Sequence, residues 1–271
     1  MIKFIKKSIT WALGIISIIF TFVPETFFEK YKLLINCSEE LNVILIRILI
    51  FFIAFLLSII INILYLKFRK KVSINGKNYS IDIKYGDLFK MSKCKKVIPF
   101  DECFTTSVGN RPSDINPNSI CGQYLKENPI QDIQSLINNI QLRPTNNKSK
   151  YQNKECYKSG KIVPNGDYLL LSFVKLDKDG LGRLSRAEYL DCLSELWKEI
   201  DKHYGQKDVC IPILGSGVTR INDTTLTKQE LLDIIIYSYK LSPYKIKFPN
   251  KLYIVCKKSE DFSLNKIGES L

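Results

Sequence analysis

The twelve residues from Asp177 to Glu188 have the residue types and the spacing of a calcium-binding loop. An EF-hand loop takes oxygen ligands from fixed positions, with a glycine at position 6 and an acid at position 12. Here acids stand at positions 1, 3 and 12 and Gly182 at position 6, but Leu181 occupies position 5, where an oxygen is needed. Such a loop also needs an entering helix and usually a second hand beside it. The neighbouring segments therefore decide between a calcium site and a simpler turn.

The segment before this loop, DYLLLSFVKL, is typical of a buried strand rather than of an entering helix. Its apolar run begins at Tyr168, shortly after Pro164 and Gly166, and it has the length of a strand. After the loop, Ser185 and Glu188 have the spacing of a helix capping box, so Glu188 has a structural role that needs no metal. The pattern favours a strand-to-helix crossover loop, and a calcium-responsive membrane protein remains an alternative.

A second candidate is the glycine-containing loop that follows the strand pattern KDVCIPIL, residues 207–214. Gly215 and Gly217 would let backbone N–H groups approach anionic oxygens, and Arg220 could close over a diphosphate with two parallel hydrogen bonds. The loop lacks the Lys-Ser/Thr pair of a Walker loop and the third glycine of a dinucleotide fingerprint. A phosphate loop and a plain tight turn both explain these residues.

The elements around these loops alternate between strand and helix patterns. An Asn75-Gly76 turn predicts a hairpin over residues 72–83. Further patterns predict a strand at 95–100, helices at about 117–127 and 129–141, a polar loop or insertion at 143–166, helices after Ser185 and Thr227, and a last strand at 251–258. This alternation indicates an α/β sheet, whose ligand site is expected in the loops after Phe100, Leu176 and Leu214.

Two long apolar runs lie in the first quarter of the chain, at residues 8–23 and 43–66. The second has no charge from Ile48 to Leu66 and at about 1.5 Å per residue reaches the thickness of a bilayer core. No small-x-small cleavage site follows the first run, which favours an uncleaved helix over a signal peptide. We therefore predict a transmembrane hairpin, with helices at about 8–24 and 43–66, as domain 1–71, and a second domain at 72–271.

The flanking charges predict the orientation of this hairpin. Lysines precede the first run, and Lys67, Arg69, Lys70 and Lys71 follow the second, whereas the connector between the runs is acidic. The N-terminus and domain 72–271 are therefore predicted to be cytoplasmic, in a multi-pass protein of the plasma or inner membrane.

The formal net charge of +13 comes from 40 basic and 27 acidic residues, and seven of the basic ones flank the apolar runs. The others are dispersed among acids without a nucleic-acid-binding motif, so we predict no nucleic-acid partner. The eight cysteines form no C-x-x-C pair, and His203 is the single histidine. This pattern disfavours a zinc site, the single histidine excludes a histidine dyad or a His-rich metal site, and free thiols in a reducing compartment are expected.

Five segments in a fixed order resemble a divergent macro domain: YGDLFK, VIPFDECFTTSVGN, SICGQYL, SRAEYLDCLSELW and IPILGSGVTRI. Together with two membrane helices, the chain resembles the membrane-anchored macro-domain effectors of type II Thoeris antiphage defence. The resemblance implies a three-layer α/β/α sandwich with a mixed sheet and a ligand of the ADP-ribose class. No metal and no cofactor is implied.

The resemblance also implies roles for individual residues. Asp87, followed by Leu88, would accept the adenine amino group. The distal ribose would lie beside the segment from Asp101 to Gly109. Because carboxylates accept from imidazole or ammonium donors, we further expect Asp101 and Glu102 to contact an additional histidine group. The diphosphate would be wrapped by the second loop. The predicted ligand-binding residues are thus Asp87, Leu88, Asp101, Glu102, Thr105, Thr106, Gly109, Gly215, Ser216, Gly217, Val218, Thr219 and Arg220.

Macro domains that hydrolyse ADP-ribosyl bonds resemble one another in an asparagine-rich strand end and a following glycine run, and both are absent from IPFDECFTT here. We therefore predict a binding protein rather than an enzyme. The resemblance implies that a Toll/interleukin-receptor-type enzyme consumes NAD to make histidine-ADP-ribose, that this signal makes the protein self-associate, and that the assembly disrupts the lipid bilayer in abortive infection. A membrane-anchored ADP-ribosyl hydrolase, with Asp101 or Glu102 as general base, remains the alternative.

Overall fold

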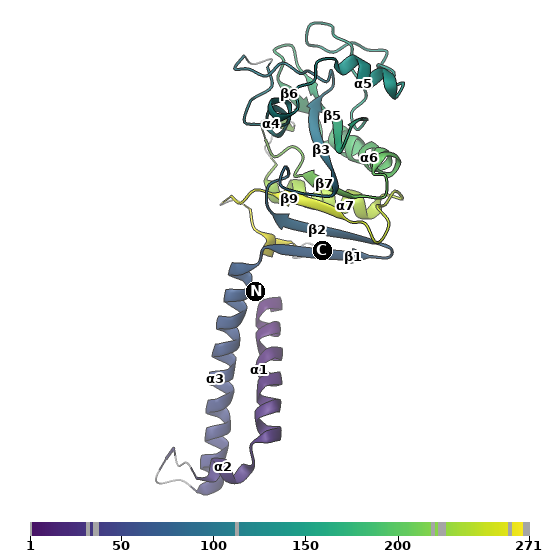
Figure 1. Cartoon of the computed structure of the whole chain (residues 1–271). Helices are drawn as coiled ribbons and strands as arrows, with labels where there is room; N and C mark the ends of the chain where they lie inside the picture. Colours follow the sequence, from purple (N-terminus) through teal and green to yellow (C-terminus); the bar gives the residue numbers. More distant parts are fainter. Residues whose placement is uncertain are drawn as a thin grey trace. The chain divides into compact units, whose positions relative to one another are not determined.

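The computed structural model describes residues 2–30, 33–34, 38–111, 114–217, 220–221, 226–259 and 262–267. The chain divides into two compact units, Met1–Arg69 and Lys70–Leu271 (Figure 1). The first unit is helical, and the second contains all the described strands.

The first unit consists of the long helices α1 (Ile2–Phe22) and α3 (Glu39–Phe68), with the short α2 (Glu25–Glu29) between them. Two segments are long and apolar enough to cross a membrane: Phe4–Phe22, within α1, and the whole of α3. Both begin earlier than the predicted helices at 8–24 and 43–66. For α3 the reason is local, because the Ser38 hydroxyl accepts from the N–H of Leu41 and two acids occupy the first turn.

Helices α1 and α3 are joined by buried polar contacts. The Ser58 hydroxyl donates to the carbonyl oxygen of Ser8 at 2.7 Å, and Asn62 Nδ2 donates to Ser8 Oγ at 3.0 Å. All three side chains are at most 5% exposed. In apolar surroundings such groups are costly without a partner, so these bonds hold the two helices in one register.

The second unit is built on a nine-stranded sheet in the part of the chain that the structure describes. Its strand order is β1-β2-β9-β7-β3-β5-β6-β8, and β4 pairs with β5 outside this path. The strands are β1 (Lys71–Gly76), β2 (Tyr79–Tyr85), β3 (Cys94–Asp101), β4 (Ile162–Asn165), β5 (Tyr168–Leu176), β6 (Gly182–Leu184), β7 (Asp208–Pro212), β8 (Arg220–Ile221) and β9 (Leu252–Cys256). The helices are α4 (Ile120–Glu127), α5 (Ile133–Asn139), α6 (Arg186–His203), α7 (Lys228–Leu241) and the 3-10 turn η1 (Leu264–Lys266).

Helices cover both faces of this sheet (Figure 1). Alternate residues of the central strands enter two separate cores: Val97 of β3 packs in the core that contains α6 and α7, and the next residue, Ile98, packs in the core of α4 and α5. β2, β9, β7, β3 and β5 run parallel as neighbours, whereas β1 and β4 pair antiparallel. The three-layer α/β/α sandwich with a mixed sheet is therefore confirmed.

Several local expectations are corrected. The first hairpin exists, but its turn is Lys77-Asn78 rather than Asn75-Gly76, since Gly76 pairs with Tyr79 as the last residue of β1. Asn78 takes the left-handed backbone conformation, φ 75°, that such a turn requires. A Cβ on Gly76 would lie 2.2 Å from the Tyr79 ring, so the glycine makes room for that ring.

Two helices begin later than the sequence predicts, and the polar segment is not entirely loop. Helix α4 starts after its cap Ser119, and α5 starts after its cap Asp132, so Pro129 lies before the helix and not in its first turn. The end of the segment 143–166 forms β4, which pairs antiparallel with β5. The capping boxes of Ser185 with Glu188 and of Thr227 with Glu230 are confirmed.

Candidate functional site

The loops predicted to hold a ligand follow parallel strands and therefore meet at one edge of the sheet. β3, β5 and β7 end at Asp101, Leu176 and Pro212, and β3 lies between the other two. β2, which leads to Asp87, belongs to the same parallel set through β9. The carboxyl edge of this set thus carries every loop that contains a predicted ligand residue.

Asp87 lies in a turn just beyond β2. Gly86 donates its N–H to the carbonyl oxygen of Cys256 at 3.0 Å, and Asp87 Oδ1 accepts from the N–H of Phe89 at 2.9 Å. Leu88 is 5% exposed and packs in the core of α4 and α5, which fixes the turn. The carboxylate is partly exposed, and among the described residues no donor is bonded to its Oδ2, which can therefore accept from an N–H group of a ligand.

Asp101 shapes the loop that follows β3. Its Oδ1 accepts from the N–H of Cys103 at 2.8 Å and from the N–H of Thr105 at 3.2 Å. Between them Phe104 takes the left-handed conformation, φ 51°, with a buried ring against Phe100 and Tyr157. Burial raises the pKa of Asp101, although the N–H groups of this loop oppose the rise.

The rest of this loop is held by backbone contacts. Thr106 is partly exposed, and Gly109 donates its N–H to the carbonyl oxygen of Ile115 at 3.2 Å. A Cβ on Gly109 would lie 2.4 Å from Asp114 Oδ2, so a larger residue here would displace the Asp114 side chain. The loop has partly exposed threonine hydroxyls on a fixed backbone, which is suitable for contacts with a sugar.

The loop after β7 begins with a tight turn. Gly215 has a φ of 83°, and Ser216 donates both its N–H and its hydroxyl to the carbonyl oxygen of Ile213, at 3.3 Å and 2.7 Å. A Cβ on Gly217 would meet nothing within 4 Å, so its backbone borders open space. Val218, Thr219 and the side chain of Arg220 lie outside the described residues, and the backbone of Arg220 begins β8.

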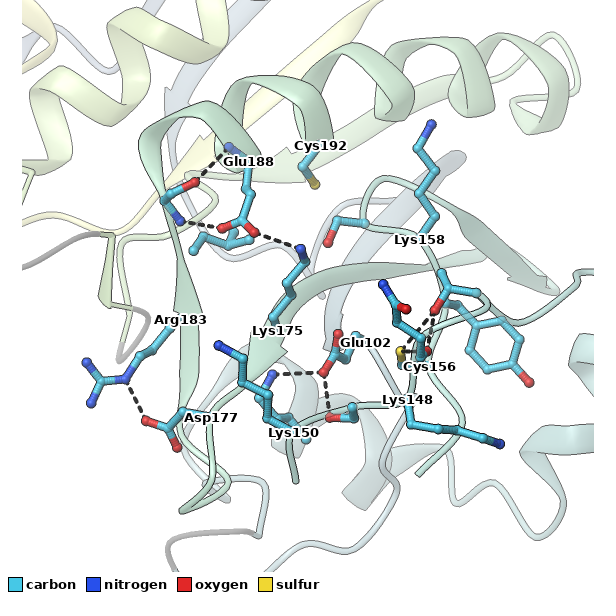
Figure 2. Close-up of a pocket in the computed structure, with 18 of the residues that line it drawn as sticks. Glu102, Lys148, Lys150, Cys156, Lys158, Lys175, Asp177, Arg183, Glu188 and Cys192 are labelled. Atoms are coloured by element: carbon cyan, nitrogen blue, oxygen red, sulfur yellow. Dashed lines mark hydrogen bonds and ion pairs between the residues drawn. The ribbon is translucent and has the colours of Figure 1, made fainter. Parts of the chain in front are cut away.

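Glu102 faces away from the loop that Asp101 shapes. Its Oε1 accepts from the hydroxyl of Ser149 at 2.5 Å and from the N–H of Leu176 at 3.2 Å. It is 5% exposed, and its backbone N–H donates to the carbonyl oxygen of Val174 at 2.7 Å. Figure 2 shows Glu102 where the segment after α5 meets the end of β5, with hydrogen bonds to both.

Glu102 lines a cavity of ≈ 620 Å³ at the carboxyl end of β5 (Figure 2). The walls come from residues 145–159, from the β5 to β6 turn and from the start of α6. Lys175 Nζ donates to Glu188 Oε1 at 2.7 Å, and this hydrogen bond, with one from the Ser185 backbone, lowers the pKa of Glu188 to about 2. Ion pairs within the walls therefore neutralise part of the charge that faces the cavity.

Comparison with known proteins places this fold and edge in a family. The model of the Thoeris protein ThsA macro domain matches residues 81–257. This range contains all the predicted ligand residues. The chain belongs to the Thoeris ThsA family. The chain is also 31% identical over 264 residues to the Thoeris protein ThsA of Bacillus amyloliquefaciens (strain Y2), across 94% of this chain and 86% of that protein.

Solved structures similar to this ThsA-family chain include a variant macrodomain of Oceanobacillus iheyensis, with a TM-score of 0.45 and 11% identity over 72% of this chain and 93% of the other. Another variant of that macrodomain, in a structure with ADPR, has the same TM-score and identity over 70% of this chain and 92% of the other.

The suspected calcium loop of this ThsA-family chain is a hydrogen-bonded turn between strands. As predicted, a strand, β5, precedes it and a helix, α6, follows it. The segment is not all loop, however, because Gly182–Leu184 form β6, which pairs antiparallel with β5. Asp177 Oδ1 accepts from the N–H groups of Asp179 and Leu181, and Oδ2 accepts from Arg183 Nε at 2.5 Å. Within the described ranges, no cluster of three or more His, Cys, Asp or Glu residues could hold a metal ion.

Sequence reasoning did not identify the residues of the insertion that line the cavity, among them Ser149 and Lys150. No local pattern indicates this lining, because the contact that holds Ser149 at the cavity is with Glu102, which is 47 residues earlier in the chain. Chemically, the edge combines a free carboxylate oxygen at Asp87, backbone N–H groups in a glycine turn, threonine hydroxyls and a charged cavity. Such a set can bind a nucleotide-sized molecule in an extended form.

Proposed function

We propose that this chain is a membrane-anchored effector whose domain 72–271 binds an ADP-ribose-derived signal, histidine-ADP-ribose. The observation that carries the proposal is the single edge that collects the Asp87 turn, the Asp101 loop and the Gly215 turn, all within the region matched by the ThsA macro domain. The role is binding rather than catalysis, and it needs no cofactor.

Each part of the edge has a role in this proposal. Asp87 Oδ2 accepts the adenine amino group, and the Gly215 to Arg220 loop wraps the diphosphate with backbone N–H groups and a guanidinium. Thr105, Thr106 and Gly109 border the distal ribose. The free oxygen of Asp87 and the open side of Gly217 support these assignments.

The proposed response is self-association followed by membrane disruption and abortive infection. The hairpin 1–71 anchors the protein in the plasma or inner membrane, with the N-terminus and domain 72–271 in the cytoplasm. A TIR-domain enzyme that consumes NAD supplies the signal. To move a population from 1:99 to 99:1, the signal must bind the assembling state about 10⁴-fold more tightly than the resting state, which is about 5.5 kcal/mol.

The test of binding is calorimetric titration of the full chain in lipid nanodiscs with ADP-ribose and with histidine-ADP-ribose. Self-association is measured separately, by light scattering from the full chain in detergent. We expect Asp87→Ala and Arg220→Ala each to weaken both ligands about ten-fold or more, because each removes a charge-assisted hydrogen bond. Asp179→Ala and Arg143→Ala are charge-matched controls at exposed positions.

Binding by the wild type and controls, with growth in mass on addition of the adduct, supports the proposal. Binding that is unchanged in Asp87→Ala and Arg220→Ala contradicts the assigned edge. Release of free ADP-ribose from the adduct during the titration contradicts a purely binding role.

A further inference from the structure

Large apolar side chains that are exposed gather in one stretch of the second unit. Among the described residues of this unit they are Val108, Leu190, Tyr237, Leu241, Tyr244 and Phe248. The last four lie between residues 237 and 248, and Leu241 and Phe248 are exposed the most, at 84% and 71%. Single exposed residues of this kind are ordinary on a protein surface, whereas a cluster marks an interaction site.

The same stretch carries positive charge. From residue 237 to residue 251 the chain contains Lys240, Lys245, Lys247 and Lys251 and no aspartate or glutamate. Aromatic rings beside lysines suit the interface of an anionic bilayer, because the rings lie at the level of the headgroups and the lysines contact phosphates. The composition therefore indicates lipid as the partner of this surface.

The backbone of this stretch is fixed beneath its exposed side chains. Ile246 is 1% exposed, and its N–H donates to the hydroxyl of Tyr239 at 2.8 Å. The N–H of Phe248 donates to the carbonyl oxygen of Asn78, in the turn between β1 and β2, at 3.4 Å. The ring of Phe248 is thus held outward by an anchored loop.

A cavity of ≈ 270 Å³ lies beside this loop. It is lined by Lys77, Asn78, Asp201, Pro243, Lys245 and Lys247. Lys245 Nζ already donates to two backbone carbonyl oxygens, whereas Lys77 and Lys247 are exposed and have no ion-pair or hydrogen-bond partner in the described part of the chain. Three lysines against one acid, Asp201, make this cavity attractive to a phosphate group.

The loop and its cavity lie at the opposite edge of the sheet from the proposed ligand site. The turn with Lys77 leads into β2, the loop 243–251 leads into β9, and these two strands are parallel. Both segments are therefore at the amino ends of the strands, whereas the loops assigned to the ligand follow the carboxyl ends. A contact made here does not cover the ligand edge.

The connection to the first unit keeps lipid within reach. Helix α3, which is long and apolar enough to cross a membrane, ends at Phe68, and β1 begins at Lys71. With two residues between them, a second unit whose hairpin lies in a bilayer meets headgroups at a high effective concentration. A modest affinity for lipid is then sufficient for contact.

We propose that the surface formed by residues 237–251 and Lys77 binds the headgroup layer of an anionic bilayer, with Leu241 and Phe248 among the lipids and phosphates at Lys77 and Lys247. The inference rests on the membrane anchoring in the proposed function and adds to it a contact that orients the ligand-binding domain. Charge complementarity favours lipid over a second copy of this chain, because the chain has a net charge of +13.

The test measures how close residue 248 comes to lipid when the full chain is held in nanodiscs. Phe248→Trp is made in a Trp11→Phe background, in which the remaining Trp197 is 1% exposed. Half of the lipid is phosphatidylcholine with brominated acyl chains, which quench nearby indole rings, and the other half is phosphatidylcholine or phosphatidylglycerol. We expect quenching at residue 248 with phosphatidylglycerol and its loss with phosphatidylcholine alone.

Lysine variants test the phosphate contacts. Lys77→Gln and Lys247→Gln should each lower the ratio of docked to undocked protein about five-fold, because a lysine near an anionic surface contributes about 1 kcal/mol. Lys126→Gln and Lys178→Gln remove exposed lysines elsewhere and are the matched controls. Leu190→Trp in the same background controls for position, since Leu190 is 51% exposed and lies in the first turns of α6.

Melting temperature and calorimetric binding of histidine-ADP-ribose are measured on the same discs. Quenching at residue 248 that needs phosphatidylglycerol, weakens in both lysine variants and is absent at residue 190 supports the inference. Quenching that is absent at residue 248, equal at the two positions or equal with the two lipids overturns it, and intact ligand binding then leaves the proposed function in place.

Two further outcomes separate the partners. Absence of quenching together with loss of self-association in Leu241→Ser would assign the surface to a second copy of the chain and overturn the contact with lipid. A full chain that does not enter the nanodiscs would overturn the proposed anchoring and this inference together.

Discussion

Asp101 at the end of β3 and Asp177 just after β5 make the same local structure at neighbouring places on the sheet edge. Each uses Oδ1 to accept two backbone N–H groups, from the residues two and four positions further along the chain. Both turns follow a buried strand, and β3 and β5 are paired in parallel. The local sequence thus gives two acids the same backbone role.

The surroundings shift the pKa values of these two carboxylates in opposite directions. Burial raises the pKa of Asp101, and the charge of the adjacent Glu102 adds to the rise. Burial would also raise the pKa of Asp177, but hydrogen bonds from Arg183 and from the N–H groups of Leu181 and Asp179 outweigh it and lower that pKa. A turn motif therefore fixes the backbone, while burial and the charges around the turn decide whether the carboxylate charge is favourable.

The largest expected effect comes from truncating each of the two aspartates to alanine in separate variants. Asp101→Ala should lower the free energy of unfolding of the second unit by about 3 kcal/mol, because two poorly solvated N–H groups lose their acceptor. Asp177→Ala should cost about 1 kcal/mol, since its turn is more accessible to water and the partly exposed pair with Arg183 is screened.

Urea denaturation of the full chain in detergent measures this difference. In a Trp11→Phe background, fluorescence reports Trp197 alone, which is 1% exposed and lies in α6. Equal costs at the two positions would show that the turns are energetically alike and that the surroundings do not matter.

A smaller but sharper test replaces each acid with its amide, which keeps an oxygen acceptor and removes only the charge. At neutral pH, Asp101→Asn should leave stability unchanged or raise it by about 1 kcal/mol, because no charge is desolvated. Asp177→Asn should lower stability by about 0.5 kcal/mol, as the pair with Arg183 is lost. The same urea assay applies, and a loss of stability in both variants would contradict the opposite pKa shifts.

The smallest expected effect is the pH dependence of the stability changes that Asp101→Asn and Asp177→Asn cause. Both aspartates titrate from an ordinary value of 3.8. The folded pKa of Asp101 is raised, so its charge costs stability as pH rises from 3.8 through the folded value. The folded pKa of Asp177 is lowered, so its contribution is present above 3.8 and is lost as pH falls through the folded value.

Accordingly, the gain from Asp101→Asn should shrink as the pH of the urea assay is lowered from about 7 toward about 4, whereas the loss from Asp177→Asn should persist over that range. A loss from Asp177→Asn that disappears between these two pH values would place its folded pKa too high for the ion pair with Arg183.

Strong local signals in the sequence predicted much of the architecture. The capping boxes at Ser185 and Thr227 predicted where α6 and α7 begin, and the apolar run from Tyr168 predicted β5 and thereby excluded an entering helix before Asp177. These predictions succeeded because capping and burial patterns act within a few residues. The hairpin turn was placed two residues too early, since the contact of Gly76 with the Tyr79 ring is not visible in the turn propensities.

The candidate site divides in the same way. The motif order placed Asp87, the Asp101 loop and the Gly215 turn at strand ends, and the structure brings them to one edge because the strands are parallel. Glu102 was grouped with Asp101 as an equivalent carboxylate. In the folded chain its hydrogen-bond partners come from 47 and 74 residues away, and they direct it into the cavity after β5.

By itself, the sequence determined the two apolar helices, the alternation of strands and helices and the turns that begin with an aspartate, since each depends on spacing along the chain. Only the tertiary structure decided that the pKa of Asp101 is raised and that the pKa of Asp177 is lowered. It also decided that the insertion and β5 enclose a cavity around Glu102. The physical reason is that burial depends on groups that the fold brings together over long separations in sequence. Even the close pair of Asp177 with Arg183 forms only when β5 and β6 fold against each other.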